Sequence, residues 1–258
     1  MKRLTVQTSN ITKLMAMVGH LMNDRSANER MGMVFGRPGE GKTTAIEHAV
    51  IQTRGVFVRA ARAWSPTSLL QALCDELQVR RSHQRYPMHQ AICQALAVDP
   101  RPVFVDEADY CAERVDLLDT LRDIYDATGV PVVLFGMDTL PGLIPAFAPN
   151  RPLHGPHARF TRRITRRLQF RGITLLDAQR VAGELCEIPV EGALAPGQEA
   201  GSVSGVGTLV ERLHGDADGN VGRLVVLLEE AERVARANEL PHVTLAAWDQ
   251  VMGTAEAA

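Results

Sequence analysis

The sequence predicts an α/β fold in which a parallel sheet lies between layers of helices and is followed by a small helical domain. Segments with helical spacing of apolar residues separate short apolar runs that lack apolar–polar alternation. These runs are Met31–Phe35, Val56–Val58, Pro102–Val105 and Pro131–Phe135. Strands buried on both faces and alternating with helices are typical of parallel sheets. From about Gly172 onward, only helical patterns remain.

Helical periodicity also predicts the elements around these strands. A final core strand is expected to begin near Phe170. Asn10 is expected to cap the first helix, and Gly129 is expected to end the helix before the fourth strand. The predicted helices are at residues 10–24, Thr43–Gln52, from Pro66, Met88–Val98 and around Leu117–Tyr125.

The last third of the chain carries the predicted helices Leu175–Ile188, Val221–Ala237 and Thr244–Met252. Between the first two, Pro189–Gly207 is rich in Gly, Pro, Ala and Ser, which predicts a mobile loop. No strand is predicted in this part. The expected organisation is therefore a helical arm at residues 1–30, an α/β domain at 31–171 and a helical domain at 172–258.

Composition narrows the class of protein. A length of 258 residues suits one mid-sized domain or a large domain with a small appendage. A net charge of −2 excludes a protein that is basic throughout. No stretch approaches the ~20 apolar residues that span a bilayer, and no secretory signal is visible, so no membrane partner is expected. The four cysteines form no CxxC pair, which favours free thiols and a cytoplasmic location.

A glycine-rich stretch follows the first predicted strand. Its sequence, GRPGEGKT from Gly36 to Thr43, matches GxxxxGK[ST] and precedes a predicted helix, the context that a phosphate-binding loop requires. Loop N–H groups converge on one anion, and the helix N-terminus adds partial positive charge. Lys42 is predicted to bridge the β- and γ-phosphates of ATP. The predicted nucleotide contacts are Gly36, Pro38, Gly39, Glu40, Gly41, Lys42, Thr43 and Thr44.

Two acids end the third predicted strand. Asp106 and Glu107 directly follow the apolar run, and the carboxyl ends of parallel strands form the ligand-binding edge of a sheet. Asp106 is predicted to hold Mg²⁺ together with the Thr43 hydroxyl, and Glu107 to polarise the attacking water as the catalytic base. The sequence therefore predicts an ATPase with ATP and Mg²⁺ as cofactors.

Further polar candidates come from arginines and from the fourth strand. NTPases of this class often use an arginine from a neighbouring subunit, and Arg163 is predicted as this finger, with Arg159 and Arg162 as alternatives. A solvated basic face or a DNA contact is the competing interpretation. Arg223, in the first turn of its helix, is predicted to reach the γ-phosphate. Asp138 or Thr139 is predicted to sense that phosphate. The crowded arginines are Arg151, Arg159, Arg162, Arg163, Arg166, Arg167 and Arg171.

The order of these motifs resembles the AAA+ ATPases of DNA transposition, a group that includes the phage Mu B transposition protein and the TnsC and TniB proteins. The phosphate loop and the acids are common to all AAA+ proteins. The discriminating segments are Asp106–Asp109 (DEAD), Leu121–Asp126 (LRDIYD) and Pro131–Gly136 (PVVLFG). The resemblance runs from about Met31 to Ala237 and implies an AAA+ domain followed by a helical lid.

The resemblance also implies a function. Such proteins bind double-stranded DNA non-specifically when loaded with ATP, form helical or ring-shaped homo-oligomers on it, and recruit or activate a transposase. The finger role of Arg163 and the lid-sensor role of Arg223 match the family's positions. Met137 departs from the pattern, because a polar sensor is common there. About thirty residues before Met31 cannot hold the DNA-binding domain that precedes the Mu B ATPase, so DNA contacts must come from the ATPase oligomer.

Two other functions remain open at the level of sequence. A P-loop ATPase of a protein-only machine, for secretion or signalling, would assemble with nucleotide but without DNA. A relative of the replication initiators or clamp loaders would prefer particular DNA structures or partners. DNA binding that requires ATP and weakens steeply with salt favours the transposition adaptor over the first of these.

Overall fold

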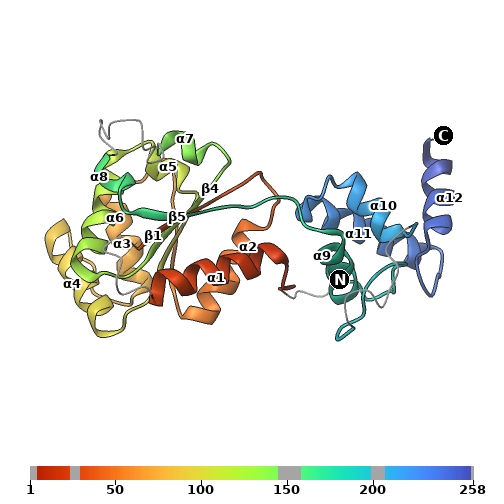
Figure 1. Ribbon diagram of the computed structural model, residues 1–258, viewed down its shortest axis with the longest axis horizontal. Helices are drawn as coiled ribbons and strands as arrows, with labels where there is room; N and C mark the ends of the chain where they lie inside the picture. The colour runs from red at the N-terminus through yellow and green to blue at the C-terminus, as the bar shows by residue number, and fades with distance from the viewer. Residues whose placement is uncertain (1–4, 24–29, 145–157, 199–206, 257–258) are drawn as a thin grey trace. The chain divides into compact units, whose positions relative to one another are not determined.

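The computed structural model describes residues 5–23, 30–144, 158–198 and 207–256. The chain divides into two compact units. The α/β unit consists of Lys13–Pro38 and Lys42–Phe170. The helical unit consists of Met1–Thr12, Gly39–Gly41 and Arg171–Ala258. Figure 1 labels most of the elements of both units.

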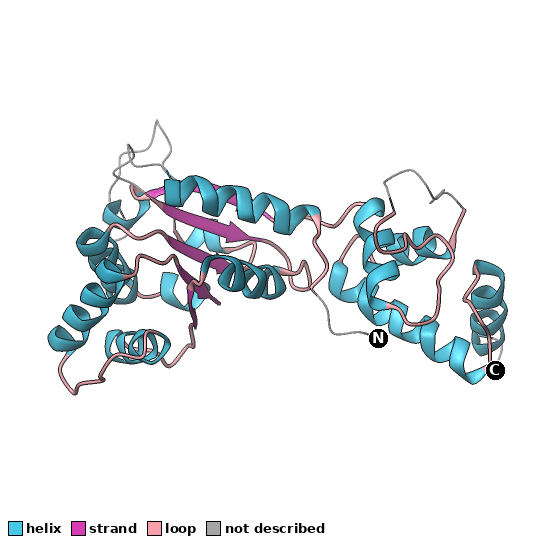
Figure 2. Cartoon of the chain, turned by 90° about the horizontal axis from the view of Figure 1, so that it is seen from below, coloured by secondary structure: helices cyan, strands magenta, loops and turns pink. Residues whose placement is uncertain are grey.

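The α/β unit contains a five-stranded sheet of order β2-β3-β4-β1-β5, in which all neighbouring strands are parallel. Figure 2 shows these strands with helices packed around them. The predicted parallel sheet is thus confirmed, and the first four strands lie within a residue or two of their predicted positions. The strands are β1 (Met31–Phe35), β2 (Val56–Arg59), β3 (Val103–Asp106), β4 (Val132–Gly136) and β5 (Ile164–Gln169).

The predicted start of the last strand is wrong. β5 ends at Gln169, and Phe170 follows it, with its N–H donating to the carbonyl of Phe35 at 2.8 Å. β5 is an edge strand, and its residues Thr165, Arg166 and Arg167 are exposed. An edge strand with exposed polar residues lacks the continuous apolar run by which the other strands were predicted, so the sequence pattern did not reveal β5.

Eight helices of the described chain begin before β5. Most match the predicted segments, and Gly129 ends α6 in the left-handed conformation, as predicted (φ 66°). The cap assigned to Asn10 is wrong: α1 begins at Ser9, and the Asn10 amide instead donates to the carbonyl of Arg171 at 2.8 Å. The helices are α1 (Ser9–Asn23), α2 (Lys42–Thr53), α3 (Pro66–Glu76), α4 (Arg85–Val98), α5 (Asp109–Ala112), α6 (Val115–Thr128), α7 (Leu140–Leu143) and α8 (Ala158–Thr161).

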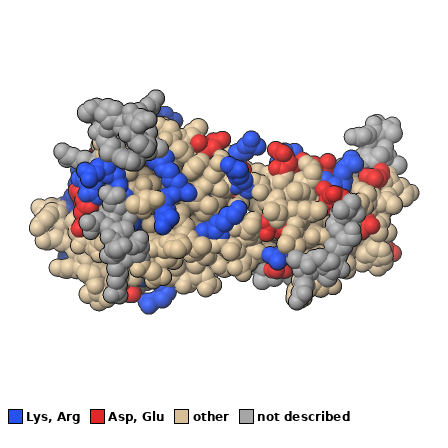
Figure 3. Space-filling model, viewed as in Figure 1, with Lys and Arg blue, Asp and Glu red and all other residues tan. Residues whose placement is uncertain are grey.

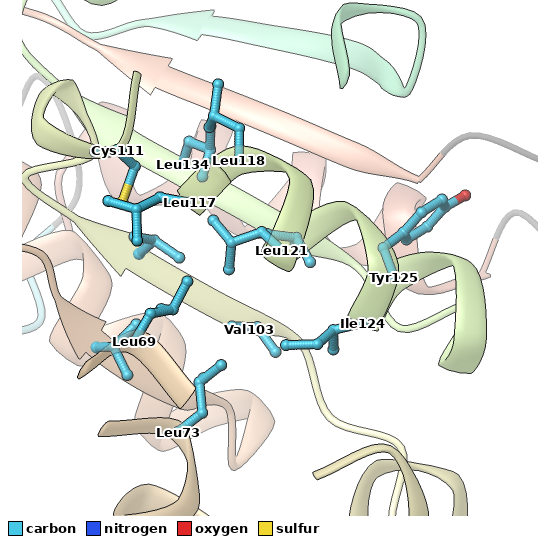
Figure 4. Packing of buried hydrophobic residues seen from close by; sticks show 14 of the residues in the cluster. Leu69, Leu73, Val103, Cys111, Leu117, Leu118, Leu121, Ile124, Tyr125 and Leu134 are labelled. Atoms are coloured by element: carbon cyan, nitrogen blue, oxygen red, sulfur yellow. The ribbon is translucent and has the colours of Figure 1, made fainter. Parts of the chain in front are cut away.

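Both faces of the sheet are covered. On one face, leucines of α3 and α6 pack against Val103 of β3 and Leu134 of β4, and all of these side chains are buried (Figure 4). On the other face, a Cβ atom added to Gly32 of β1 would lie 3.0 Å from Leu21 and 3.2 Å from Met17 of α1. Burial on both faces explains why the strands show no apolar–polar alternation.

The helical unit packs around its own apolar core. A capping box starts its first helix: the Thr174 hydroxyl accepts from the Asp177 N–H, and the Asp177 carboxylate accepts in return. An isolated parallel bridge joins Val190 to Val243, and no strand is found among the described residues of this unit. Part of the predicted mobile loop, 199–206, lies outside the described residues. The helices are α9 (Leu175–Leu185), α10 (Leu209–Asp216), α11 (Val221–Ala237) and α12 (Leu245–Glu256).

Across the described residues, no helix combines the length and apolar character that a membrane span requires.

Candidate functional site

The phosphate loop leaves the carboxyl end of β1 and leads into α2. Lys42, the first residue of α2, folds back over the loop: its ammonium donates to the carbonyls of Gly36 at 2.7 Å and Arg37 at 2.8 Å. This arrangement holds a cation at the start of a helix, where the backbone already favours an anion. Thr44, the third predicted contact on α2, is exposed.

Sheet order brings the second acidic motif to this loop. β1 and β3 both pair with β4, so their carboxyl ends lie at the same edge. There the Thr43 hydroxyl donates to the Asp106 carboxylate at 3.2 Å, although the residues are 63 positions apart. Asp106 is buried, with only 3% of its surface exposed. A hydroxyl and a carboxylate are hard oxygen ligands, and Mg²⁺ is usually bound by one or two protein oxygens plus waters and phosphates. Thr43 and Asp106 therefore fit the predicted Mg²⁺ site.

Glu107 lies beside this pair in an unusual backbone conformation. Its φ of 54° is in the left-handed region, which is uncommon for residues other than glycine. Flanking hydrogen bonds hold it there: the Ala108 N–H donates to Phe135 O at 2.8 Å, and the Glu107 N–H donates to the Asp106 carboxylate at 3.0 Å. The Glu107 side chain is exposed, and strained positions of this kind cluster at active sites. The geometry suits a carboxylate that acts on a water outside the buried metal ligand.

Arg59 is a site residue that sequence reasoning missed. It ends β2, pairs in register with Asp106, and its guanidinium lies 3.3 Å from the Asp106 carboxylate. The Arg59 side chain is 54% exposed and that of Asp106 is 4% exposed. Arg59 therefore supplies the positive charge that balances a buried carboxylate. The sequence feature that could have identified Arg59 is its position directly after an apolar run, the same position that Asp106 has at the end of β3.

The tip of the loop, Gly39–Gly41, belongs to the helical unit. Gly39 and Gly41 have φ of 78° and 81°, values that glycine adopts readily, and Glu40 between them is buried. The Gly222 N–H donates to Gly39 O at 2.8 Å. Space is short here, because a Cβ atom on Gly39 would overlap the Asn220 side-chain oxygen.

Asn220 also caps α11, accepting from the backbone N–H of Arg223 at 3.0 Å. The Arg223 side chain lies in the first turn of α11 and is exposed. Its predicted reach to the γ-phosphate stays a prediction. Pro38, which precedes the loop tip, is exposed as well.

Asp109 joins the acidic motif to the end of β4. Its carboxylate accepts from the Met137 N–H at 2.8 Å and from the Thr139 hydroxyl at 3.5 Å. Asp138, between them, is exposed. Both sensor candidates thus follow the strand next to Asp106, and the choice between Asp138 and Thr139 stays open.

Arg163 lies at the opposite edge of the sheet from the phosphate loop. Its carbonyl accepts from the N–H of Met31, the first residue of β1, whereas the loop follows the last residue of that strand. A five-residue strand is roughly 16 Å long, which places Arg163 out of reach of its own nucleotide site. Its guanidinium makes two hydrogen bonds of 2.7 Å to Asp126. Arg163 therefore does not reach the phosphate loop of its own chain, and its finger role stays a prediction.

The alternative finger residues are less defined. Arg162 is exposed in the turn before β5. Arg159 is in α8, but its side chain is not among those the structure describes, and Arg151 lies outside the described residues.

Comparisons with known proteins concern the domain and the fold. Residues 25–144 match the family described as AAA domain. A comparison with curated protein sequences gives no match. The fold is similar to that of the Aeropyrum pernix ORC1 protein, solved in complex with DNA, with a TM-score of 0.60 and 16% identity over 98% of this chain and 67% of that one. It is also similar to Cdc6p from Pyrobaculum aerophilum, with a TM-score of 0.56 and 14% identity over 90% of this chain and 62% of that one.

Together, the match and the geometry identify an AAA-type P-loop ATPase domain on an AAA+ fold. The protein is an ATPase, as the phosphate loop and the acidic motif predicted. This chain spans about two thirds of the length of the two structures, so their likeness concerns the fold that is shared.

Proposed function

We propose, from the AAA-type ATPase domain at residues 25–144, that this protein uses ATP binding to assemble on duplex DNA and ATP hydrolysis to leave it. The observation that carries the proposal is the contact of 3.2 Å between Thr43 and Asp106, which brings together the two residues predicted to hold Mg²⁺. On DNA, we propose that the oligomer recruits or activates a transposase, the role implied by the resemblance to the transposition ATPases.

The residues of the site divide the chemistry among themselves. Lys42 and the loop N–H groups bind the β- and γ-phosphates, while Thr43 and Asp106 hold Mg²⁺. When bound, Mg²⁺ neutralises charge that develops on the phosphates. Glu107 orients a water in line with the γ-phosphate and accepts its proton. Arg163 of a neighbouring copy stabilises the transition state. Hydrolysis then requires two adjacent subunits and depends on assembly.

The DNA part of the proposal has two supports. One is the fold shared with the Aeropyrum pernix ORC1 protein, whose structure was solved in complex with DNA. The other is the order of motifs, which resembles that of the transposition ATPases. The same fold likeness favours a second candidate, an initiator-like ATPase that assembles at a particular DNA site. The two candidates differ in sequence preference, because the adaptor binds any duplex.

The test uses Glu107→Gln, which is expected to keep ATP binding but to lower hydrolysis about 10²–10⁴-fold, the usual contribution of a general base. With ATP, this variant should stay on random-sequence duplex DNA in a filter-binding or mobility-shift assay, while the wild type releases it. The matched control is Glu113→Gln, an exposed acid that directly follows α5.

Three outcomes decide between the candidates. If the ATP-loaded Glu107→Gln variant leaves duplex DNA unshifted at low salt, the DNA function is wrong. Binding confined to one sequence in a footprint favours the initiator-like candidate. Sequence-independent binding, combined with ATP-dependent stimulation of strand transfer by a transposase from the same genetic element, supports the adaptor.

A further inference from the structure

The segment around β5 has an unusual charge pattern. Residues 139–176 contain seven arginines and no aspartate or glutamate. The rest of the chain is acidic, because its 21 lysines and arginines (28 less these seven) face all 30 aspartates and glutamates. A segment this one-sided produces a local positive potential that the net charge conceals.

Three of these arginines lie on the surface of the α/β unit. Arg162 precedes β5, and Arg166 and Arg167 are within it; all three are exposed. Within the described ranges, none of the three forms an ion pair with an acid. Blue patches of lysine and arginine lie over the region that β5 occupies in Figure 1, as Figure 3 shows.

Three exposed arginines elsewhere in the α/β unit are, by contrast, paired with acids. Arg54 pairs with Asp99, Arg81 with Asp75, and Arg114 with Asp116. Even Arg163, adjacent to β5, is held by Asp126. Partial burial also lowers the pKa of the Arg167 guanidinium, because the charged form loses water there. Arginine stays charged at neutral pH, so this cation is partly dehydrated without a neighbouring acid to balance it.

The strand geometry presents these charges on both sides of one edge. Arg166 pairs in register with Gly32 and Arg167 with Met33, so the two side chains point to opposite faces of the sheet. The pairing shifts at the start of β5, where a bulge separates the partners of Met31 and Gly32. Because β5 is an edge strand, a chain of anions running along it meets arginines from both faces.

We propose that the open edge of β5, formed by Arg162, Arg166 and Arg167, is a binding surface for the phosphate backbone of duplex DNA. The proposal rests on the DNA-binding function proposed above and gives it a location. Guanidinium groups suit phosphate oxygens because they donate several hydrogen bonds in a planar fork. Contacts to the backbone alone carry no sequence information, so this surface would bind any duplex.

The test measures affinity for a fluorescent random-sequence duplex of about 30 bp by anisotropy, with a non-hydrolysable ATP analogue, from about 50 to 300 mM salt. The variant is Arg166→Gln/Arg167→Gln. The matched control is Arg54→Gln/Arg80→Gln, which removes the same charge from exposed positions beside β2 and after α3. Affinity for the ATP analogue, measured separately, verifies that each variant is folded.

The β5 variant should bind DNA at least about tenfold more weakly at about 0.1 M salt. The slope of log K against log salt should become shallower by about 2, because each substituted arginine leaves about one phosphate without its cation. Arg166→Lys/Arg167→Lys should keep most of the slope because it keeps the charge. If the double glutamine variant does not fold, Arg162→Gln alone should lower the slope by about 1.

The outcomes separate this inference from the proposed function. If the wild type binds DNA and the β5 variant matches it in affinity and slope, the surface is wrong while the function stands. If the wild type itself leaves DNA unbound, both fail. Equal weakening of DNA binding in the β5 variant and the Arg54→Gln/Arg80→Gln control overturns the surface as well, since net charge alone then explains the effect. Stronger binding to anionic lipid vesicles than to DNA would also overturn it.

Discussion

Two edges of one sheet use arginine and lysine in opposite ways. At the carboxyl edge, Lys42 is held by carbonyls of the loop and Arg59 by Asp106, all within 3.3 Å. Along the β5 edge, Arg166 and Arg167 are exposed and meet no acid in the described part of the chain. Cations fixed by protein atoms suit a small ligand of constant shape, because their positions need no reorganisation on binding. Cations without partners suit a long anion whose contacts are interchangeable.

The difference indicates how the two activities can be separated by substitution. A change at the carboxyl edge should alter nucleotide affinity first and DNA affinity only as a consequence. A change at β5 should alter DNA affinity while leaving nucleotide affinity unchanged. Substitutions of Lys42, of the predicted finger Arg163 and of Arg59 beside Asp106 each test this division.

Lys42→Ala should weaken ATP binding at least about 100-fold. The ammonium makes charge-assisted hydrogen bonds, each worth roughly 1.5–3 kcal/mol, and about 2.7 kcal/mol corresponds to this factor. Isothermal titration calorimetry with Mg²⁺ and an ATP analogue measures the effect. Lys13→Ala, an exposed lysine on α1, is the control and should bind ATP normally.

The same variant sharpens the comparison of the two edges. Lys42→Ala should lose ATP-dependent DNA binding although every arginine of β5 is intact. An unchanged ATP affinity in Lys42→Ala would remove the phosphate-loop assignment. Retained ATP-dependent DNA binding in a variant that no longer binds ATP would break the proposed order of events.

Arg163→Ala should lower hydrolysis about 10³-fold or more, the effect typical of an arginine finger, while ATP affinity is unchanged. Because Arg163 lies at the amino end of the sheet, its loss should be complemented in trans. Mixing Arg163→Ala, which has an intact nucleotide site, with Lys42→Ala, which has an intact Arg163, should restore phosphate release. Each protein alone should stay inactive.

Arg162→Ala provides the comparison for this experiment, because Arg162 is the neighbouring alternative. If Arg162→Ala fails in hydrolysis and is complemented while Arg163→Ala is normal, the finger is Arg162. If neither variant is complemented, hydrolysis does not depend on a neighbouring copy. In that case the pairing of Arg163 with Asp126 is structural only.

Local patterns explain why so much of the nucleotide site was predicted. The phosphate loop and the acids at Asp106 and Glu107 each follow an apolar run, and a strand followed by a glycine-rich turn and a helix leaves few alternatives. The strands β1 and β4 and the helix α11 were located to within a residue for the same reason. Their buried faces impose a period that can be read directly from the sequence.

Features that depend on pairing between distant segments were not predicted. Arg59 joins the site only because β2 lies beside β3, and strand order is not visible in either segment alone. Asp126 and Arg163 are 37 residues apart. The position of β5 was predicted wrongly because an edge strand needs few apolar residues. Its arginines are equally typical of a solvent-exposed turn. The cluster of arginines that suggests DNA binding could therefore be seen in the sequence, whereas its arrangement along the β5 edge of the sheet could not.

The smallest predicted effect concerns Arg59, the cation that balances Asp106. Arg59→Gln should lower the free energy of unfolding by about 1 kcal/mol without nucleotide, a modest value because half of the arginine is solvated. That corresponds to a melting temperature about 2–4 °C lower. With Mg²⁺ and ATP the difference should shrink, because the bound metal then supplies the charge opposite Asp106. Differential scanning calorimetry with and without Mg²⁺ and ATP measures both values.

Arg54→Gln is the matched control, since Arg54 pairs with Asp99 but both side chains are well exposed, at 75% and 44%. Its melting temperature should change by less than about 1 °C under either condition. A destabilisation in Arg59→Gln that persists unchanged with Mg²⁺ and ATP would mean that the guanidinium and the metal do not share Asp106. The pairing of Arg59 with Asp106 at the carboxyl edge would then serve only to stabilise the fold. The difference between this edge and the β5 edge would no longer be explained by the ligands that each edge binds.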